Sequence, residues 1–539
     1  MTVTGGKRSG SDGYCLRVPD SSQQSAGRPA EMPTRPEQPP RTGLATVAGW
    51  LGDELLEMRS AAPLTTVTGV TMSAERVVPG DLFVAPAGAR AHGAAYAGAA
   101  LAAGAAAVLT DPAGARMCEP SPVPVLVVPA PRAVVGSVAA RIYGNPAGRM
   151  VLVGVTGTQG KTTTTRLAEG ALTAAGVPAA VVGTVGTRIL GTEVKTSLTT
   201  PEAPDLHAMF AVMVERGVRV CAVEVSSHAL VMGRVDGVVF DVAAFTNLGR
   251  DHLDFHTDDE DYFRAKASLF TPRRARLGLV NIDDAHGARL LVESEVATRS
   301  FSARRDADWR AVDVRSTATG SSFAVQRRDG TRVETRVPLP GDYNVVNALC
   351  AIAALGEAGL DVRSVAGHMA SAGSVPGRME RVEAGQDYLA VVDYAHKPDA
   401  VAAVLGALRP QTGGRLIVVL GAGGDRDPGK RPLMGATAAR LADVVVVTDD
   451  NPRSEDPAAI RAAVLAGTAE VAAGRRAEIR EEANRRAAIR FAVSAARPGD
   501  TVVIAGKGHE SGQEVDGEVQ PFDDRMVLSE EITAAGARR

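Results

Sequence analysis

The chain has 539 residues, too many for a single hydrophobic core, and this length indicates roughly three or four domains. Hydrophobic residues make up 45% of the sequence, and the formal net charge is −3 at pH 7. This balance argues against a nucleic-acid or membrane-surface partner, because both attract a marked excess of basic residues. The four cysteines lie far apart and form no metal-binding or disulfide pattern, so we expect a cytoplasmic protein.

Residues 1–42 are rich in Ser, Gly, Pro and Arg and lack the apolar core of a signal peptide. They predict a disordered tail. The segment 94–110, "AAYAGAALAAGAAAVLT", is the one membrane-like run, but it consists mostly of alanine and glycine. It predicts a packed helix followed by a strand, and we expect no membrane insertion.

Beyond the tail, apolar runs such as "DLFVAP", "MVLVGVTGTQGKT" and "DVVVVTDDNPRSED" alternate with helical patterns. Continuous Val, Ile and Leu runs are typical of parallel strands that helices cover on both faces. We therefore expect an α/β fold of three domains: a smaller N-terminal domain at 43–147, a central, mostly parallel sheet domain at 148–380 and a Rossmann-like domain at 381–539. Open α/β sheets bind ligands beyond the carboxyl ends of their strands, so the polar strand ends predict a cleft between two domains.

The segment Gly154–Thr165, "GVTGTQGKTTTT", is the strongest local motif. It follows a predicted strand and precedes a helical pattern, which is the context of a phosphate-binding loop. Its glycines let backbone N–H groups approach phosphate oxygens, while Lys161 reaches the terminal phosphates and Thr162 offers a hydroxyl to magnesium. Val155 stands where the strict pattern has glycine, so the loop is a variant. The alternative is a glycine-rich turn with an incidental Lys-Thr pair.

Two more predicted strands end in side chains that suit a nucleotide site. Glu224 of "EVSSHAL" closes one of them, where a carboxylate that faces a phosphate loop suits magnesium, directly or through water. The segment 246–256, "TNLGRDHLDFH", closes another and contributes His252. Each side chain taken alone is more often structural than catalytic. Their convergence on one edge of the sheet favours a functional site.

Lysine is scarce in this chain: of 59 basic residues only seven are lysines, and the others are arginines. An ammonium group can be deprotonated and can react, whereas a guanidinium group effectively cannot. Lys266 of "YFRAKASLF" lies fourteen residues after His252, in a segment with helical character. Reaction with carbon dioxide would turn it into a carbamate, which is an anionic oxygen ligand for magnesium. The alternative is a lysine that extends from a helix into solvent.

The ordered motifs "GTQGKT", "LTTPEAPDL", "EVSSHAL", "FTNLGRDHLDFH", "YFRAKASLF", "LPGDYNVVNAL", "VPGRMERV", "VVDYAHKPDA", "GAGGDRDPGKRPLM", "DDNPRSED" and "GKGHE" together resemble those of the Mur ligase family. The resemblance covers residues 45–530. It implies an N-terminal domain that binds a uridine nucleotide, a central ATP-binding domain and a C-terminal domain that binds the incoming amino acid.

Within the family, the motifs are similar to those of ligases that use ATP and Mg²⁺ to add meso-diaminopimelate to the D-glutamate γ-carboxylate of UDP-N-acetylmuramoyl-L-alanyl-D-glutamate. This reaction passes through an acyl phosphate and belongs to bacterial peptidoglycan precursor synthesis. The resemblance implies that Lys266 is carbamylated and helps hold magnesium with Thr162, Glu224 and His252. The expected partners are ATP, meso-diaminopimelate and UDP-N-acetylmuramoyl-L-alanyl-D-glutamate. We expect no nucleic-acid partner, and we expect a monomer.

The resemblance also implies roles for individual residues. Catalysis falls to Lys161, Lys266, Glu224 and His252. The residues implied to bind ATP are Gly157, Thr158, Gln159, Gly160, Lys161, Thr162, Thr163, Asn281, Arg378, Asp393 and His396. Those implied to bind the UDP-linked muramoyl dipeptide are Met72, Ala74, Thr199, Thr200, Ser226 and Arg234. Those implied to bind diaminopimelate are Arg426, Asp450, Asn451, Pro452, Arg453, Gly506 and Glu510.

The amino acid that the enzyme selects is predicted from the segment "DDNPRSED" at 449–456. Diaminopimelate carries a far carboxylate that lysine lacks, and Arg453 can bind it with two parallel hydrogen bonds. Glu510 is the expected acceptor for the far ammonium group, and Arg426 is expected to bind the other carboxylate. The alternative for Arg453 is a surface salt bridge with Glu455 or Asp456.

This sequence departs from the family in two places. The triplet Ser73-Ala74-Glu75 stands where the family often has Asp-Ser-Arg, and Met232 stands where a glutamine often precedes the substrate arginine. Other functions remain as alternatives: a ligase that adds L-lysine, a folylpolyglutamate synthase with the same nucleotide loop, or a non-catalytic nucleotide-binding regulator. Intact Lys161, Glu224, His252 and Lys266 argue against the regulator.

Overall fold

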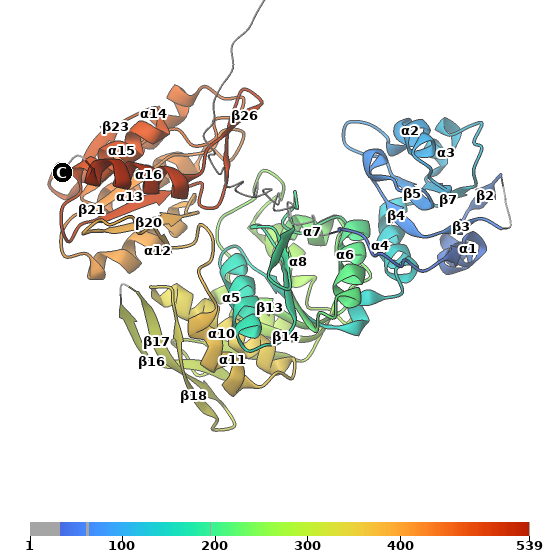
Figure 1. The fold of residues 1–539 in the computed structure, drawn as a ribbon, viewed down its shortest axis with the longest axis horizontal. Helices are drawn as coiled ribbons and strands as arrows, with labels where there is room; N and C mark the ends of the chain where they lie inside the picture. The colour runs from blue at the N-terminus through green and yellow to red at the C-terminus, as the bar shows by residue number, and fades with distance from the viewer. Residues whose placement is uncertain (1–32, 61–63, 195, 318, 538–539) are drawn as a thin grey trace, which may run out of the picture. The chain divides into compact units, whose positions relative to one another are not determined.

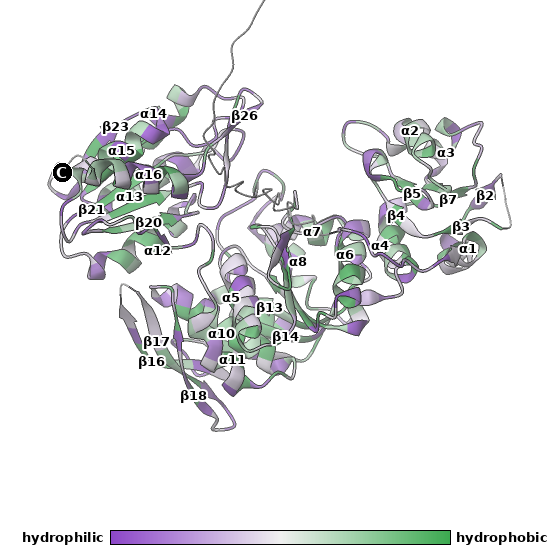
Figure 2. Ribbon diagram, viewed as in Figure 1, coloured by the Kyte–Doolittle hydropathy of each residue, from purple (hydrophilic) through white to green (hydrophobic). Residues whose placement is uncertain are grey.

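The computed structural model describes residues 33–60, 64–194, 196–317 and 319–537. Within this part of the chain, strands build three large sheets that follow one another from the blue to the red end of Figure 1. The helices of Figure 2 carry green and purple sectors, as expected of helices that pack one apolar face on a sheet. The predicted α/β fold of three successive sheets is confirmed.

The N-terminal sheet has the order β2-β7-β6-β5-β4, in which β4 to β7 are parallel and β2 is antiparallel. Its strands are β2 (Glu57–Arg59), β4 (Gly69–Thr71), β5 (Asp81–Ala85), β6 (Ala107–Thr110) and β7 (Val125–Val127), and its helices are α1 (Leu44–Leu51), α2 (Ala97–Ala102), α3 (Pro112–Met117) and α4 (Pro131–Ile142). The alanine-rich run is α2 followed by β6, as predicted. Among the described residues, no helix has the length and apolar character needed to cross a membrane.

The central sheet has the order β11-β10-β9-β12-β8-β13-β14-β15-β16-β17-β18, parallel from β9 to β16 and antiparallel at both edges. Its strands are β8 (Val151–Thr156), β9 (Ala179–Val182), β10 (Thr187–Ile189), β11 (Thr192–Val194), β12 (Val220–Glu224), β13 (Phe240–Phe245), β14 (Ala275–Asn281), β15 (Thr298–Ser302), β16 (Trp309–Thr317), β17 (Gly320–Arg327) and β18 (Arg332–Val337). Its helices are α5 (Lys161–Ala174), α6 (Ala203–Glu215), α7 (Ser227–Val231), α8 (Asp259–Ala267), α9 (Ala285–Glu293), α10 (Asp342–Glu357) and α11 (Val362–His368).

The third sheet has the order β19-β20-β24-β21-β22-β23 and is parallel except for β19. Its strands are β19 (Glu380–Arg381), β20 (Leu389–Asp393), β21 (Leu416–Leu420), β22 (Val444–Val447), β23 (Glu478–Glu481) and β24 (Thr501–Ala505), and its helices are α12 (Pro398–Leu408), α13 (Lys430–Leu441), α14 (Pro457–Ala469), α15 (Arg485–Ala495) and α16 (Asp524–Gly536). A separate hairpin consists of β25 (Gly512–Val515) and β26 (Glu518–Pro521). Strand β19 crosses the expected boundary at residue 380.

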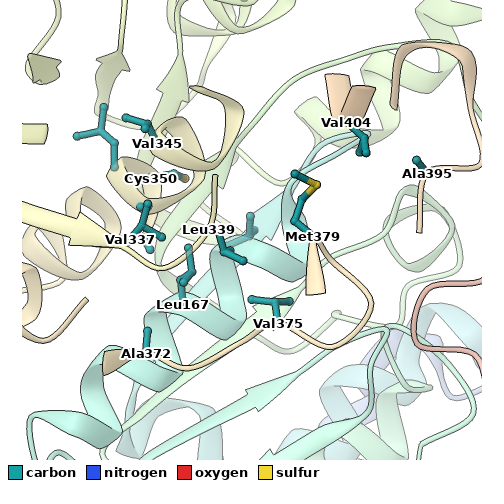
Figure 3. Close-up of a cluster of buried hydrophobic side chains, with 14 of the residues drawn as sticks. Leu167, Val337, Leu339, Val345, Cys350, Ala372, Val375, Met379, Ala395 and Val404 are labelled. Atoms are coloured by element: carbon teal, nitrogen blue, oxygen red, sulfur yellow. The ribbon is translucent and has the colours of Figure 1, made fainter. Parts of the chain in front are cut away.

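A continuous core fixes the base of the phosphate loop. Leu167 of α5 packs with Val345 and Cys350 of α10 in a cluster that extends to Val375 and Met379 (Figure 3). Lys161 is the first residue of α5, so this packing fixes the position of its backbone. The large side chains of the cluster are almost fully buried, and each stabilises the fold by about 1.5–3 kcal/mol.

The predicted disordered tail needs a correction at its C-terminal end. Its first 32 residues lie outside the described part of the chain, but residues 33–42 contact the domains. Arg35 Nη1 lies 2.7 Å from Asp81 Oδ1, and the backbone N–H of Glu37 donates to Glu215 Oε2 at 2.9 Å. The prediction is therefore wrong for residues 33–42, because composition alone does not reveal a distant buried carboxylate that needs a cation.

Candidate active site

The phosphate loop lies between β8 and α5, and the end of β13 holds it in place. Thr158 N donates to the carbonyl of Asn247 at 2.9 Å, and Thr246 Oγ1 donates to the carbonyl of Gln159 at 2.6 Å. Gly157 has φ of +143°, and a Cβ atom there would lie 2.0 Å from Thr246 Oγ1. Only glycine fits this conformation and this close approach. The predicted strand–loop–helix context is confirmed, and the loop is more than an incidental turn.

Two lysines converge on one backbone carbonyl oxygen of this loop. Lys161 Nζ donates to the carbonyl of Gly157 at 2.8 Å, and Lys266 Nζ donates to the same oxygen at 2.9 Å. Lys266 lies near the end of α8 and is 1% exposed, so it does not extend into solvent. Burial, together with the positive charge of Lys161, lowers the pKa of Lys266 well below its usual range. Burial also lowers the pKa of Lys161, to about 8.

Glu224 lies at the end of β12 with its carboxylate buried against the loop. Thr162 Oγ1 donates to Glu224 Oε2 at 3.0 Å, and the backbone and hydroxyl groups of Thr184 donate to its two oxygens at 2.9 and 3.0 Å. Thr200 Oγ1 donates to the backbone carbonyl of Glu224 at 2.7 Å. The parallel pairing of β12 with β8 places Glu224 beside Val155. The predicted meeting of strand ends is confirmed for this carboxylate.

His252 follows β13, and its backbone has φ of +53°. Its Nε2 lies 3.0 Å from Asp251 Oδ2, and the same carboxylate pairs with Lys397. Although burial opposes ionisation of Asp251, the hydrogen bond from His252 and the charge of Lys397 hold the pKa of that carboxyl well below its usual range. Asp251 and Lys397 were not predicted as site residues, although the scarcity of lysine offered a signal for Lys397.

A cavity of about 520 Å³ gathers many of the predicted residues. Its lining includes Thr158, Gln159, Gly160, Lys161, Thr162, Thr163, Thr199, Glu224, Ser226, Arg234, His252, Arg378, Asp393, His396 and Arg426. It also includes Thr184, Asp251, Tyr394 and Lys397, which the sequence analysis missed. Because residues from the central domain and from the expected Rossmann-like domain line the same space, the predicted cleft is present.

Several predicted residues lie outside this lining. Gly157, Thr200 and Lys266 lie behind it, where they support the loop and Glu224. Asn281 uses its amide to bind the carbonyl of Thr246 at 2.9 Å and the N–H of Asp283 at 3.1 Å. A role for Asn281 near adenine stays a prediction.

Arg378, Asp393 and His396 lie together at the start of the third sheet. The guanidinium of Arg378 is 4.4 Å from the ring centroid of Tyr394, and its Nη2 donates to Thr162 Oγ1 at 3.3 Å. Burial raises the pKa of Asp393 to about 6 and lowers the pKa of His396 well below its usual range. At neutral pH, His396 is therefore uncharged and can accept or donate a hydrogen bond without adding positive charge.

The predicted amino-acid site forms a separate cluster beside the hairpin. Arg453 Nε lies 3.2 Å from Glu514 Oε2, and its Nη1 donates to the carbonyl of Gly424 at 2.7 Å. The alternative pairing of Arg453 with Glu455 or Asp456 is wrong, since Glu455 pairs with Arg431 and the Asp456 side chain accepts from the N–H of Ala458. Arg426 is exposed and binds only the carbonyl of Asp425 among its described contacts.

The acidic groups of this cluster differ in how they are bound. Glu510 Oε1 accepts from Tyr394 at 3.3 Å, and its Oε2 accepts from Asn451 and Lys507 at 2.8 and 3.2 Å. Asp450 Oδ2, by contrast, is buried without a hydrogen-bond partner among the described atoms. Such an oxygen has a desolvation cost that a bound cation would offset. The predicted neighbours Pro452 and Gly506 complete the cluster, with Gly506 packed directly against Asp450.

A second cavity, of about 600 Å³, lies between the N-terminal sheet and α6. Met72, Arg76 and Tyr96 line it from the N-terminal domain, and Asp205 and Met209 line it from α6. Arg76 Nη1 donates to Asp205 Oδ2 at 2.8 Å. Ala74, a predicted nucleotide contact, packs instead against the apolar cluster around Cys118. The departure at Ser73-Ala74-Glu75 had already weakened that assignment.

Comparison with known proteins agrees with this geometry. The Mur ligase family, catalytic domain, matches residues 66–143; the Mur ligase middle domain matches 155–355; and the glutamate ligase domain matches 377–508. A protein of Streptomyces avermitilis named UDP-N-acetylmuramoyl-L-alanyl-D-glutamate–2,6-diaminopimelate ligase is 54% identical over 93% of this chain and 98% of its own length. Its namesake in Streptomyces coelicolor is 53% identical over the same shares.

The solved structures point the same way. A structure titled as UDP-N-acetylmuramoyl-L-alanyl-D-glutamate–2,6-diaminopimelate ligase is 32% identical, covers 92% of this chain and 100% of its own, and superposes with a TM-score of 0.65. The matched segments, the order of the three sheets and identity above half over nearly the full length agree with one another. The chain belongs to the Mur ligase family.

Proposed function

We propose that this protein is the ATP-dependent ligase that joins meso-diaminopimelate to the D-glutamate γ-carboxylate of UDP-N-acetylmuramoyl-L-alanyl-D-glutamate in peptidoglycan precursor synthesis. The observation that carries the proposal is the cavity in which Lys161, Glu224 and Arg378 meet at the phosphate loop. The names of its relatives supply the substrates. The family places such ligases in the cytoplasm, and a monomer stays our expectation.

The reaction consists of two displacements. The γ-carboxylate of D-glutamate attacks the γ-phosphorus of ATP, so that an acyl phosphate forms and ADP leaves. The neutral amine of diaminopimelate then attacks the acyl carbon, the C–O bond to phosphate breaks, and the amine loses a proton. Lys161 offsets the charge that builds up on the phosphates, and the loop holds the reacting groups in line. Enclosure of the acyl phosphate protects it from water.

The residues near Glu224 fit a magnesium ion. Thr162 offers a hydroxyl oxygen and Glu224 a carboxylate, both hard oxygen donors of the kind that magnesium prefers. Among the described residues, no group of three or more His, Cys, Asp and Glu side chains is placed to hold a metal. Thr162 and Glu224 would share the ion with water and substrate phosphates, and a further anionic oxygen from the protein would strengthen the site. The chemistry supplied by such an ion would be positive charge that offsets the charge of the phosphates.

Lys266 can supply that oxygen by becoming a carbamate. The lowered pKa of Lys266 favours its neutral amine, whose nitrogen lone pair can attack carbon dioxide; the nitrogen then loses one proton and the product carries one negative charge. The carbamate would also place a negative charge beside Lys161, where the protonated form of Lys266 would place a second positive charge. His252, on the neighbouring loop, is our proposed fourth participant.

The cluster around Arg453 supports diaminopimelate over L-lysine as the amino acid. Arg453 keeps Nη2 free of described partners, so it can bind a far carboxylate that lysine does not have. Glu510 remains the expected acceptor for the far ammonium, and the unpaired oxygen of Asp450 is a second acceptor beside it. The second cavity, with Met72 and Arg76 in its lining, is our proposed site for the uridine nucleotide.

The pH dependence of ATP affinity should report Lys161. Phosphate binding favours the ammonium form and raises its pKa, so affinity falls as pH rises through about 8, the pKa of the ligand-free protein. We expect the Kd for ATP to increase about tenfold between pH 7 and pH 9, as measured by calorimetry. The Lys161→Met variant should bind ATP more weakly at both pH values, and its Kd at pH 9 should be nearly the same as its Kd at pH 7. An equal pH dependence in this variant would contradict the assignment.

Lys266→Ala should lose nearly all ligase activity, because the site loses its additional oxygen anion. Short carboxylic acids such as formate or acetate should restore part of the activity by occupying the space that the side chain leaves. Lys161→Ala is the matched control, because its missing group is a cation that carboxylates do not replace. Full activity of Lys266→Ala, or equal rescue of both variants, would contradict the carbamate.

An ADP-release assay with each amino acid tests the substrate directly. The wild-type enzyme should turn over with meso-diaminopimelate and far less with L-lysine. Arg453→Ala should raise the KM for diaminopimelate by a few hundredfold, because removal of one partner of a buried charged pair costs about 3–5 kcal/mol. The KM values for ATP and the muramoyl dipeptide should change little.

Arg440→Ala is the control for this measurement, since Arg440 is exposed on α13 and its described contact is with Thr437 of the same helix. A wild-type preference for lysine would overturn the assigned substrate. Normal use of diaminopimelate by Arg453→Ala would overturn the role of this arginine alone.

A further inference from the structure

Residues 33–42, here called the N-terminal strap, connect the N-terminal sheet to α6 of the central domain. Arg35 Nη1 donates to Asp81 Oδ1 at 2.7 Å and its Nη2 donates to the carbonyl of Arg76 at 3.1 Å. Further along, the N–H groups of Glu37 and Gln38 donate to the two oxygens of Glu215 at 2.9 and 3.0 Å. The strap then joins β1 (Thr42–Gly43), which pairs with β3 (Thr66–Val67).

The binding site for Arg35 is built into the domain. The Asp81 side chain is 2% exposed, and its second oxygen accepts from the N–H of Val78 at 2.9 Å. A Cβ atom on Gly69 would lie 2.7 Å from Arg35 Nη1, so the absence of a side chain there makes room for the guanidinium. Tyr143 also accepts from Arg35, at 3.3 Å. A buried carboxylate without this cation would carry a large desolvation cost.

The strap acts on the wall of the second cavity. Thr34 lines the cavity directly. Arg35 holds the main chain at Arg76, whose own side chain lines the cavity and binds Asp205 on its opposite wall at 2.8 Å. The same strap is fixed to the end of α6 through Arg216, whose Nη2 donates to Glu37 Oε1 at 2.8 Å. Both walls of the cavity are thus tied to one short segment.

We infer that Arg35 is a positioning residue for the UDP-linked substrate: through Asp81 and the carbonyl of Arg76, it sets the distance between the two cavity walls. The inference rests on the proposal that this cavity takes the uridine nucleotide. Arg35 does not itself need to touch the substrate. We expect its effect on one of the three substrates, because the described lining of the ATP cavity shares only Ser197 and Leu198 with that of this cavity.

Steady-state kinetics of the full-length chain test the inference. Arg35→Ala should raise the KM for UDP-N-acetylmuramoyl-L-alanyl-D-glutamate about tenfold, because the cavity wall that carries Arg76 is no longer held in place. Its kcat and its KM values for ATP and diaminopimelate should stay within about twofold. Arg35→Lys keeps a cation beside Asp81 but has no planar fork to reach Arg76 as well, so it should keep the wild-type melting temperature and still raise this KM.

Arg41→Ala is the matched control, because Arg41 lies in the same strap and has no side-chain partner among the described residues. It should behave as the wild type. An unchanged KM in both Arg35 variants would overturn the inference, as would a parallel rise of all three KM values with a lower melting temperature. Arg132→Ala alters the cavity lining directly. If Arg132→Ala raises the KM for the UDP-linked substrate and the Arg35 variants do not, the positioning role of Arg35 is wrong and the proposed nucleotide site stands. If no variant raises this KM, both the role of Arg35 and the proposed nucleotide site are wrong.

Discussion

The site depends on one backbone carbonyl, that of Gly157, which accepts hydrogen bonds from two lysines. Like charges this close in a buried environment repel each other, and burial removes the water that would screen them. Burial lowers the pKa of both lysines, and the positive charge of Lys161 lowers the pKa of Lys266 further. Each lysine has a different way to relieve the repulsion. Lys161 faces the cavity and can pair with phosphate, whereas Lys266 lies behind the loop and can lose its charge by reaction.

Two carboxylates of the site hold neighbouring segments together through their hydrogen-bond and ion-pair partners. Glu224 is held by Thr162 and Thr184 at the end of β12, and Asp251 is held by His252 and Lys397. Apart from the neighbouring His252, these partners come from segments distant in sequence. Removing one partner leaves an uncompensated buried charge, so each pair ties two segments together. The strap is attached to the N-terminal sheet in the same way, by the ion pair of Arg35 with Asp81.

Much of the architecture was predictable because parallel strands buried on both faces leave continuous apolar runs. The runs at β5, β8, β12 and β22 were recognised in this way, and the polar residues that end β8 and β12 meet as expected. The antiparallel strands β16 to β18 were not predicted, because they mix polar and apolar residues and contain no continuous apolar run.

Other features depend on pairings that a single sequence does not reveal. Arg35 looks like one more residue of a polar tail until Asp81, 46 positions later, is seen to be buried beside it. Arg453 was expected to bind the substrate carboxylate, with Glu455 or Asp456 as alternative partners, and the hairpin brings Glu514 to it instead of either alternative. Lys266 was singled out by the rarity of lysine, yet its burial and its contact with Gly157 required the structure.

The central claim, that repulsion at Gly157 is relieved by carbamate formation on Lys266, is tested most directly by carbon-13 NMR of the protein in ¹³C-labelled bicarbonate. The wild-type enzyme and Lys161→Ala should each show a carbamate resonance, and Lys266→Ala should lack it. Acidification should remove the resonance, because protonated carbamates release carbon dioxide. An active wild-type enzyme without this resonance, or the same resonance in Lys266→Ala, would contradict the account.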